Sequence, residues 1–114
     1  MLTHERLDVY CCSIEFLATT QSFLRRFSRG QAPLADQLRR AAMSIPLNIA
    51  EGTGKTTEAD RKNFFLIARG SASECGAILD VASVMNPLDP EEVGKAKLLL
   101  ERIVSMLTKM GQNG

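Results

Sequence analysis

The chain has 114 residues, of which 45% are hydrophobic and 24% are charged, a balance typical of a single globular domain and outside the range of disordered chains. Its three cysteines are an odd number, and Cys11 and Cys12 are neighbours, which excludes a paired disulfide framework and favours free thiols in a reducing compartment. The net charge of +1 by itself favours neither an acidic nor a basic partner.

The sequence shows no membrane or export signal. The chain starts with a polar stretch at residues 3–8, and no window reaches the ~20 apolar residues that a membrane span requires. We therefore expect no signal peptide, no membrane partner and a cytoplasmic location.

Charge is uneven along the chain. Residues 25–69 carry nine basic and four acidic side chains, whereas residues 1–24 and 70–114 each have a net charge of −2. The basic middle is where an acidic partner is expected.

The first predicted helix carries two apolar stripes. It is expected over residues 4–28, with Thr3 as its N-cap, because the stretch is periodic and contains neither proline nor glycine. One stripe begins at Leu7, and at 100° per residue it lies about 200° from the second, which begins at Val9. A helix in a monomeric bundle needs one stripe, so the second predicts self-association, and the alternative is a helix buried on both sides. The second stripe consists of Val9, Phe16, Phe23 and Phe27.

The middle of the chain predicts a second helix that ends in a turn. Residues 34–50 resume helical periodicity, and Pro46 should kink this helix because its ring clashes with the carbonyl group four residues earlier. The Gly-Thr-Gly-Lys-Thr at residues 52–56 is similar to the end of a phosphate-binding loop. However, Ile49 stands where that loop needs its first glycine, and no strand precedes it. A helix end followed by a short turn is the favoured interpretation.

A third helix is expected to run to about Asn86, with Thr56 or Thr57 as its N-cap. Small residues surround Gly70 and Gly76 in this segment. Small side chains allow two helix axes to approach closely, so we expect the third helix to cross the second most tightly here. The two glycines weaken a helix by about 1 kcal/mol each relative to alanine, which suggests that packing offsets the loss.

A fourth helix begins at the clearest boundary in the chain. Asp89 supplies an acceptor cap and Pro90 occupies the first helical position. Apolar periodicity continues to about residue 110. The sequence thus predicts an all-α fold, an antiparallel up-and-down four-helix bundle formed by residues 1–110 as one domain, with residues 111–114 as a frayed tail.

Polar residues interrupt the apolar faces of the second and third helices. If these helices pair antiparallel, Arg39 or Arg40 comes near residues 70–74, and Glu51 comes near Arg61. We expect such residues to form ion pairs that fix the register of the bundle rather than a catalytic centre. The full set is Arg39, Arg40, Ser44, Asn48, Glu51, Arg69 and Glu74.

The sequence offers few groups for catalysis or metal binding. His4 is the single histidine, and the repeated Glu-x-x-His pattern of di-iron bundles is missing. We expect no catalytic residue, metal site, cofactor or small-molecule substrate, and hence no enzymatic activity. The remaining functional candidates are cations suited to nucleic-acid phosphates. They are Arg25, Arg26, Arg29, Lys55, Arg61 and Lys62.

Residues 37–52 contain Leu-Arg-Arg-Ala-Ala and Ser-Ile-Pro-Leu-Asn-Ile-Ala-Glu-Gly, and Arg61, Phe64, Phe65 and residues 67–74 continue the pattern. On these residues nearly the whole chain resembles the four-helix bundle family encoded in intervening sequences of bacterial large-subunit rRNA genes. That family includes the accessory protein of diversity-generating retroelement reverse transcriptases. The resemblance implies a homopentameric ring with no known enzymatic activity. For the retroelement members it also implies a basic ring that binds nucleic acid and the reverse transcriptase, and this chain departs from them in being almost neutral.

Two hypotheses of different classes follow. In the first, the protein is a non-enzymatic oligomeric scaffold or accessory protein that associates with RNA, DNA or a nucleic-acid enzyme through a basic surface repeated in the ring. In the second, it is a protein-interaction ring that binds no nucleic acid. Salt-sensitive binding distinguishes the two, because phosphate contacts release counterions and protein contacts of apolar character do not.

Overall fold

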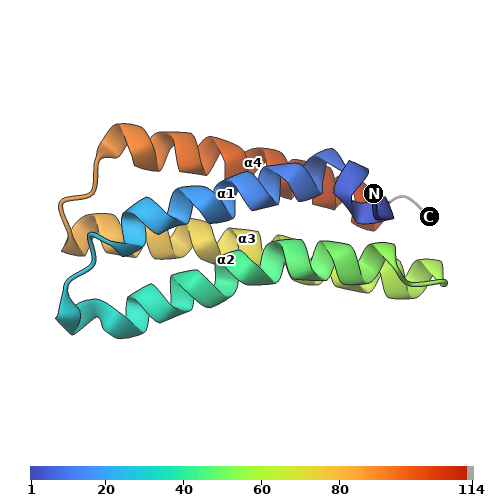
Figure 1. Cartoon of the computed structure of the whole chain (residues 1–114), viewed down its shortest axis with the longest axis horizontal. Helices are drawn as coiled ribbons and strands as arrows, with labels where there is room; N and C mark the ends of the chain where they lie inside the picture. The colour runs from blue at the N-terminus through green and yellow to red at the C-terminus, as the bar shows by residue number, and fades with distance from the viewer. Residues whose placement is uncertain (113–114) are drawn as a thin grey trace.

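Four long helices lie side by side in the structure, a computed structural model that describes residues 1–112 (Figure 1). They are α1 (Asp8–Leu24), α2 (Ala32–Thr53), α3 (Glu58–Met85) and α4 (Pro90–Gln112). A short 3-10 turn precedes each of the first two helices: η1 (Thr3–Arg6) lies before α1 and η2 (Arg29–Gln31) lies before α2. All regular structure in the described residues is helical, so the predicted all-α four-helix bundle is confirmed. None of the helices described is long and apolar enough to cross a membrane.

Consecutive helices run in opposite directions, which places different loops at the two ends of the bundle (Figure 1). The α1–α2 and α3–α4 loops share one end, where the Gln31 Nε2 donates to the carbonyl oxygen of Met85 at 3.5 Å. The α2–α3 turn and the N-terminus lie at the other end, along a long axis of 44 Å. α2 packs on α3, α3 on α4, and α1 on both α2 and α4. α2 and α4 are therefore diagonal partners.

The predicted caps of α3 and α4 are present. Thr57, rather than Thr56, caps α3, since its hydroxyl accepts a hydrogen bond from the Asp60 N–H at 3.2 Å. At the start of α4 the Asp89 carboxylate accepts from the Glu91 N–H at 3.0 Å. Each cap satisfies one of the backbone donors that a helix N-terminus leaves without an intrahelical partner.

Other helix boundaries differ from the prediction. The chain starts with the turn Thr3–Arg6 rather than with α1, and Leu7 precedes α1 without a side-chain cap. α1 ends at Leu24, four residues before the predicted end. α4 continues to Gln112, so the first two residues of the predicted tail are helical, whereas residues 113–114 lie outside the described part.

α2 continues through Pro46 as one helix, and the kink at this residue stays a prediction. A polar network lies beside the proline. The Asn48 Nδ2 donates to both the carbonyl oxygen and the hydroxyl oxygen of Ser44, each at 2.8 Å, and the Ser71 hydroxyl of α3 donates to the same Ser44 hydroxyl at 2.8 Å. Asn48 thus bonds within its own helix, and the link between α2 and α3 is the pair of serines, which fixes their register.

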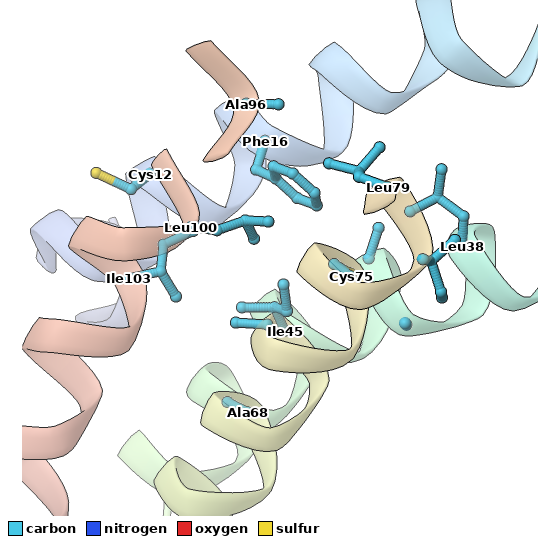
Figure 2. Close-up of a cluster of buried hydrophobic side chains, with 14 of the residues drawn as sticks. Cys12, Phe16, Leu38, Ile45, Ala68, Cys75, Leu79, Ala96, Leu100 and Ile103 are labelled. Carbon is cyan, nitrogen blue, oxygen red and sulfur yellow. The ribbon is translucent and has the colours of Figure 1, made fainter. Parts of the chain in front are cut away.

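The core lies between the four helices and is filled mainly by apolar side chains. Phe16 and Phe23 of α1 are fully buried. Figure 2 shows Phe16 pointing from α1 into the space between α3 and α4, where Leu79 and Leu100 lie beside its ring. Burial of such large side chains stabilises a fold by about 1.5–3 kcal/mol each, so α1 is held mainly by its phenylalanines.

The stripe predicted to mediate self-association is part of this core, and that assignment is wrong. Val9, Phe16 and Phe23 are at most 2% exposed, and Phe27 is half-buried against the core. The reason is geometric. Leu17 directly follows Phe16, so it lies 100° around the helix rather than on the opposite side, and it packs against the core from the flank of the same broad face. α1 therefore buries the second stripe within its own chain, whereas in the stripe that begins at Leu7 the leucines are half-buried and Cys11 and Ile14 are exposed.

Gly52 is the glycine on which close packing between α2 and α3 depends. A Cβ at this position would lie 2.9 Å from Phe65 Cε1 and 3.0 Å from Phe64 Cβ, which is closer than side chains tolerate. Gly70 has nothing within 4 Å of its Cβ position, and a Cβ on Gly76 would meet only a side chain of α4 at 3.9 Å. The prediction that packing offsets the cost of these two glycines is therefore wrong, whereas a tight crossing of α2 and α3 at the small residues 68–77 stays a prediction.

Candidate nucleic-acid interface

The structure divides the six predicted phosphate contacts between opposite ends of the bundle. Residues 25–29 follow α1 and lie at the end that holds the α1–α2 and α3–α4 loops, whereas residues 55–62 lie at the α2–α3 turn (Figure 1). The long axis of the molecule is 44 Å. One copy of the chain therefore does not present all six cations as one surface.

Most cations of the α2–α3 turn are engaged within the chain. The Lys55 Nζ lies 3.5 Å from the Glu51 carboxylate and 5.2 Å from the centre of the Phe64 ring. The Arg61 Nη1 donates to the carbonyl oxygens of Lys55 and of the next residue, both at 3.1 Å, and so closes the turn. Lys62 has no ion pair within the described chain. The Gly-Lys-Thr stretch is thus a self-stabilised helix end and turn.

The two ends of the bundle differ in net charge. Residues 51–62 hold three basic and three acidic side chains, a net charge of zero, whereas residues 25–40 hold five arginines and one aspartate, a net charge of +4. The neighbouring α3–α4 loop is acidic, and the Arg26 Nη1 lies 3.4 Å from the Glu92 carboxylate of α4. Arg26 therefore pairs with a carboxylate of its own chain. The excess positive charge lies on the α1–α2 side of this end.

We define the arginine surface as Arg25, Arg29, Arg39 and Arg40, all of which are exposed. Within residues 1–112 only Arg39 of this set forms an ion pair, 2.8 Å from Asp36 of its own helix. The predicted pairing of Arg39 or Arg40 with α3 is therefore wrong. The sequence signal for this surface is the group of five arginines on both sides of the α1–α2 loop.

A notch of about 480 Å³ lies between α1 and α2 within the arginine surface. It is lined by Gln21, Leu24 and Arg25 of the first helix and its end, and by Arg39 of α2. The Arg25 Nε donates to the carbonyl oxygen of Gln21 at 3.3 Å, which holds the guanidinium beside the notch. A guanidinium has five N–H donors, so two arginines with one hydrogen bond each in the described structure keep most of their donors for a ligand.

The other polar residues predicted to be structural make contacts inside the bundle or face solvent. The Arg69 Nη1 donates to the Thr108 hydroxyl at 3.4 Å and so links α3 to α4. Glu51, predicted near Arg61, forms its ion pair within the end of α2 instead. Glu74 is exposed. None of these contacts brings an acid, a base and a nucleophile together in the part of the chain that the structure describes.

The described residues hold no group of three or more His, Cys, Asp or Glu side chains placed for a metal ion. Burial raises the pKa of the Cys75 thiol from 9.0 to about 12, and the charge of Glu74 adds to this effect. A thiol with that pKa is protonated at neutral pH, and the thiolate is the nucleophilic form. The Cys75 thiol is therefore not a nucleophile at neutral pH. Cys75 and Cys12 are buried in the core, while Cys11 is exposed.

Comparison with known proteins places this bundle in a family. Residues 5–109 match the model of a family described as 23S rRNA-intervening sequence protein. A crystal structure from Bacteroides thetaiotaomicron, described as a protein of unknown function from the S23 ribosomal protein family, covers 92% of this chain and 99% of its own, with a TM-score of 0.83 and 21% identity. At that identity the likeness shows the fold. A comparison with curated proteins gives no match. Since the family model spans most of the sequence, the chain belongs to the 23S rRNA-intervening sequence protein family.

Proposed function

We propose that this protein is a non-enzymatic, self-associating bundle that binds the phosphates of RNA or DNA through its arginine surface. The observation that carries the proposal is the contrast between a net charge of +4 over residues 25–40 and zero over residues 51–62. Binding of a nucleic-acid backbone requires several cations on one face. Arginine suits this role because its planar donors match two phosphate oxygens at once.

Exposed apolar residues on α3 support the self-association. Ile67, Val81 and Val84 are 43%, 47% and 89% exposed. Exposed Gly70, Glu74 and Ala77 complete a series with steps of three or four residues, so all six positions share the side of α3 that faces away from the bundle. A largely apolar face of this kind, here with one carboxylate in it, is a candidate protein interface. An oligomer, a pentamer by the family resemblance, would repeat the arginine surface and strengthen weak phosphate contacts through avidity.

A double variant tests the α3 interface. Ile67→Asp with Val81→Asp is expected to lower the mass measured by light scattering while helix content, measured by circular dichroism, is retained. Both side chains are exposed in one copy, so the carboxylates cost little there, whereas burial of unpaired charges at an interface is costly. Leu98→Asp, at an exposed position of α4, should leave the mass unchanged. A monomeric wild-type protein would contradict self-association, and an unchanged mass of the double variant would contradict this interface.

Titration with nucleic acid tests the binding function. We expect a structured RNA and a single-stranded DNA to bind with a dissociation constant in the micromolar range or below at low salt. Three to four phosphate contacts give a slope of log K against log salt of about −2 to −3 for single strands. Measurement at two salt concentrations provides this slope. An absence of salt-sensitive binding tighter than micromolar would contradict the proposal.

The second candidate is a protein-interaction ring that binds no nucleic acid. Its support is the same exposed face of α3 together with the net charge of +1 for the whole chain. A partner of this ring would cover apolar side chains, and an enzyme that acts on nucleic acid, such as a reverse transcriptase, is the partner class that the family resemblance implies. Salt-independent capture of such a partner, without binding of RNA or DNA, is the result that favours this candidate.

A further inference from the structure

We infer that the notch between α1 and α2 is a binding site for one phosphate group, held between the guanidinium groups of Arg25 and Arg39. The site rests on the proposed nucleic-acid function and deepens it, because it names the chemical group that is bound and the two residues that bind it. Both arginines line the same notch although they come from different helices. Each therefore approaches a ligand in the notch from its own side.

The charges at the notch favour an anion. Two guanidinium groups that line one small volume repel each other, and an anion between them removes the repulsion and adds hydrogen bonds. None of the lining residues is acidic, and the Asp36 carboxylate pairs with one of them, Arg39. With Arg25, Arg39 and Asp36 counted together, one positive charge remains for a ligand. Arg25 brings no ion pair of its own within the described residues.

The lining of the notch suits a phosphate with its attached sugar. The notch is shallow and largely open to solvent, so a bound phosphate keeps part of its hydration. Leu24 supplies an apolar surface beside the two arginines. The Gln21 side chain is held along α1, since its Nε2 donates to the Leu17 carbonyl oxygen at 3.3 Å. A charged end and an apolar wall together match a phosphate ester better than a bare ion.

Asp36 competes with the phosphate for Arg39. The side chains of this ion pair are 49% and 61% exposed for Arg39 and Asp36, and exposed pairs of this kind contribute little to stability. A phosphate can therefore take over the Arg39 donors. Asp36→Asn removes the competing charge and should tighten binding by about two- to fivefold, since one nearby charge in an exposed setting has an effect of this order.

Two sources of the phosphate group are distinguished by the choice of probe. A single-stranded oligonucleotide with a 5′-hydroxyl end offers only internal phosphodiesters, the same oligonucleotide with a 5′-phosphate adds a monoester, and inorganic phosphate offers the free ion. Binding is followed by fluorescence anisotropy for the oligonucleotides. For all three probes, the Nε–H resonances of Arg25 and Arg39 are followed by NMR, and we expect these two to shift first.

Matched substitutions test the two arginines. Arg25→Ala and Arg39→Ala should each weaken oligonucleotide binding about tenfold and reduce the salt slope by about one, as expected for a lost phosphate contact. Arg40→Ala removes the same charge from the next residue of α2, outside the notch, and should weaken binding less than about threefold. Arg102→Ala, at an exposed position of α4, should have no effect. Circular dichroism verifies that each variant keeps its helices.

The outcomes separate this site from the proposed function. Equal losses for Arg40→Ala and the two notch variants would overturn the phosphate site and leave nucleic-acid binding by diffuse charge. Shifts of the Arg25 and Arg39 resonances with inorganic phosphate, without binding of either oligonucleotide, would support the site and overturn the proposed function. No shift and no binding with any probe would overturn both.

Discussion

Replacement of Phe16 with alanine is expected to lower the free energy of unfolding by about 3–5 kcal/mol, the usual effect of removing a buried aromatic side chain. Phe16 is fully buried between α1, α3 and α4 (Figure 2), and no small movement of three helices fills the space that its ring leaves. A domain of this size has a total stability of only about 5–15 kcal/mol. The variant should therefore unfold at a much lower urea concentration.

Urea unfolding followed by circular dichroism measures this loss. Phe27→Ala is the control, because Phe27 is only half-buried at the edge of the core and should cost clearly less. A Phe16→Ala protein that keeps its stability but loses molecular mass would contradict the structure, since it would place Phe16 between copies of the chain rather than inside one.

Replacement of Gly52 with alanine is expected to destabilise the bundle by about 1–3 kcal/mol, the usual effect of overpacking. The added methyl group would lie 2.9 Å from the Phe65 ring and 3.0 Å from Phe64 Cβ. The ring can move slightly, but the Cβ atom is fixed to the backbone of α3. Separation of the helix ends would then disturb the turn that Arg61 closes.

A second glycine provides a matched control for Gly52. Gly94 of α4 is exposed, and its Cβ position has nothing within 4 Å. Gly94→Ala should raise the free energy of unfolding by about 0.5–1 kcal/mol, because alanine is the better helix former. Both variants are compared by urea unfolding at the same protein concentration. Equal changes of the same sign would show that helix propensity, and not close packing, decides the effect at Gly52.

The sequence was sufficient for the architecture because helix signals are local. Thr57 and Asp89 form caps with residues two or three positions away, so both helix starts were predictable without knowledge of the fold. The role of the apolar stripes was not predictable in the same way. Which of Phe16 and Leu17 faces the core depends on how α1 is rotated against α2 and α4, and that rotation is set by packing between elements far apart in sequence.

The candidate site was predictable only in part for the same reason. The cations at residues 25–29 were found from composition, and their location at one end of the bundle follows from helix order. The pairing of Lys55 with Glu51 is readable from their spacing of four residues, whereas the hydrogen bonds of Arg61 depend on the path of the turn backbone, which the sequence pattern does not show. The pattern alone does not show which side of α2 faces α1, so it predicts an ion pair of Arg39 with α3 instead of the exposed pair with Asp36. The notch therefore became visible only in the structure.

The most direct test of the central claim compares two double variants that each remove two positive charges. The claim is that nucleic acid binds at the arginine surface and not at the α2–α3 turn. Arg29→Ala with Arg40→Ala should weaken binding of a single-stranded oligonucleotide at low salt about tenfold, whereas Lys55→Ala with Lys62→Ala should change it less than about twofold. Equal losses for the two variants, or a larger loss for the lysine pair, would contradict the claim.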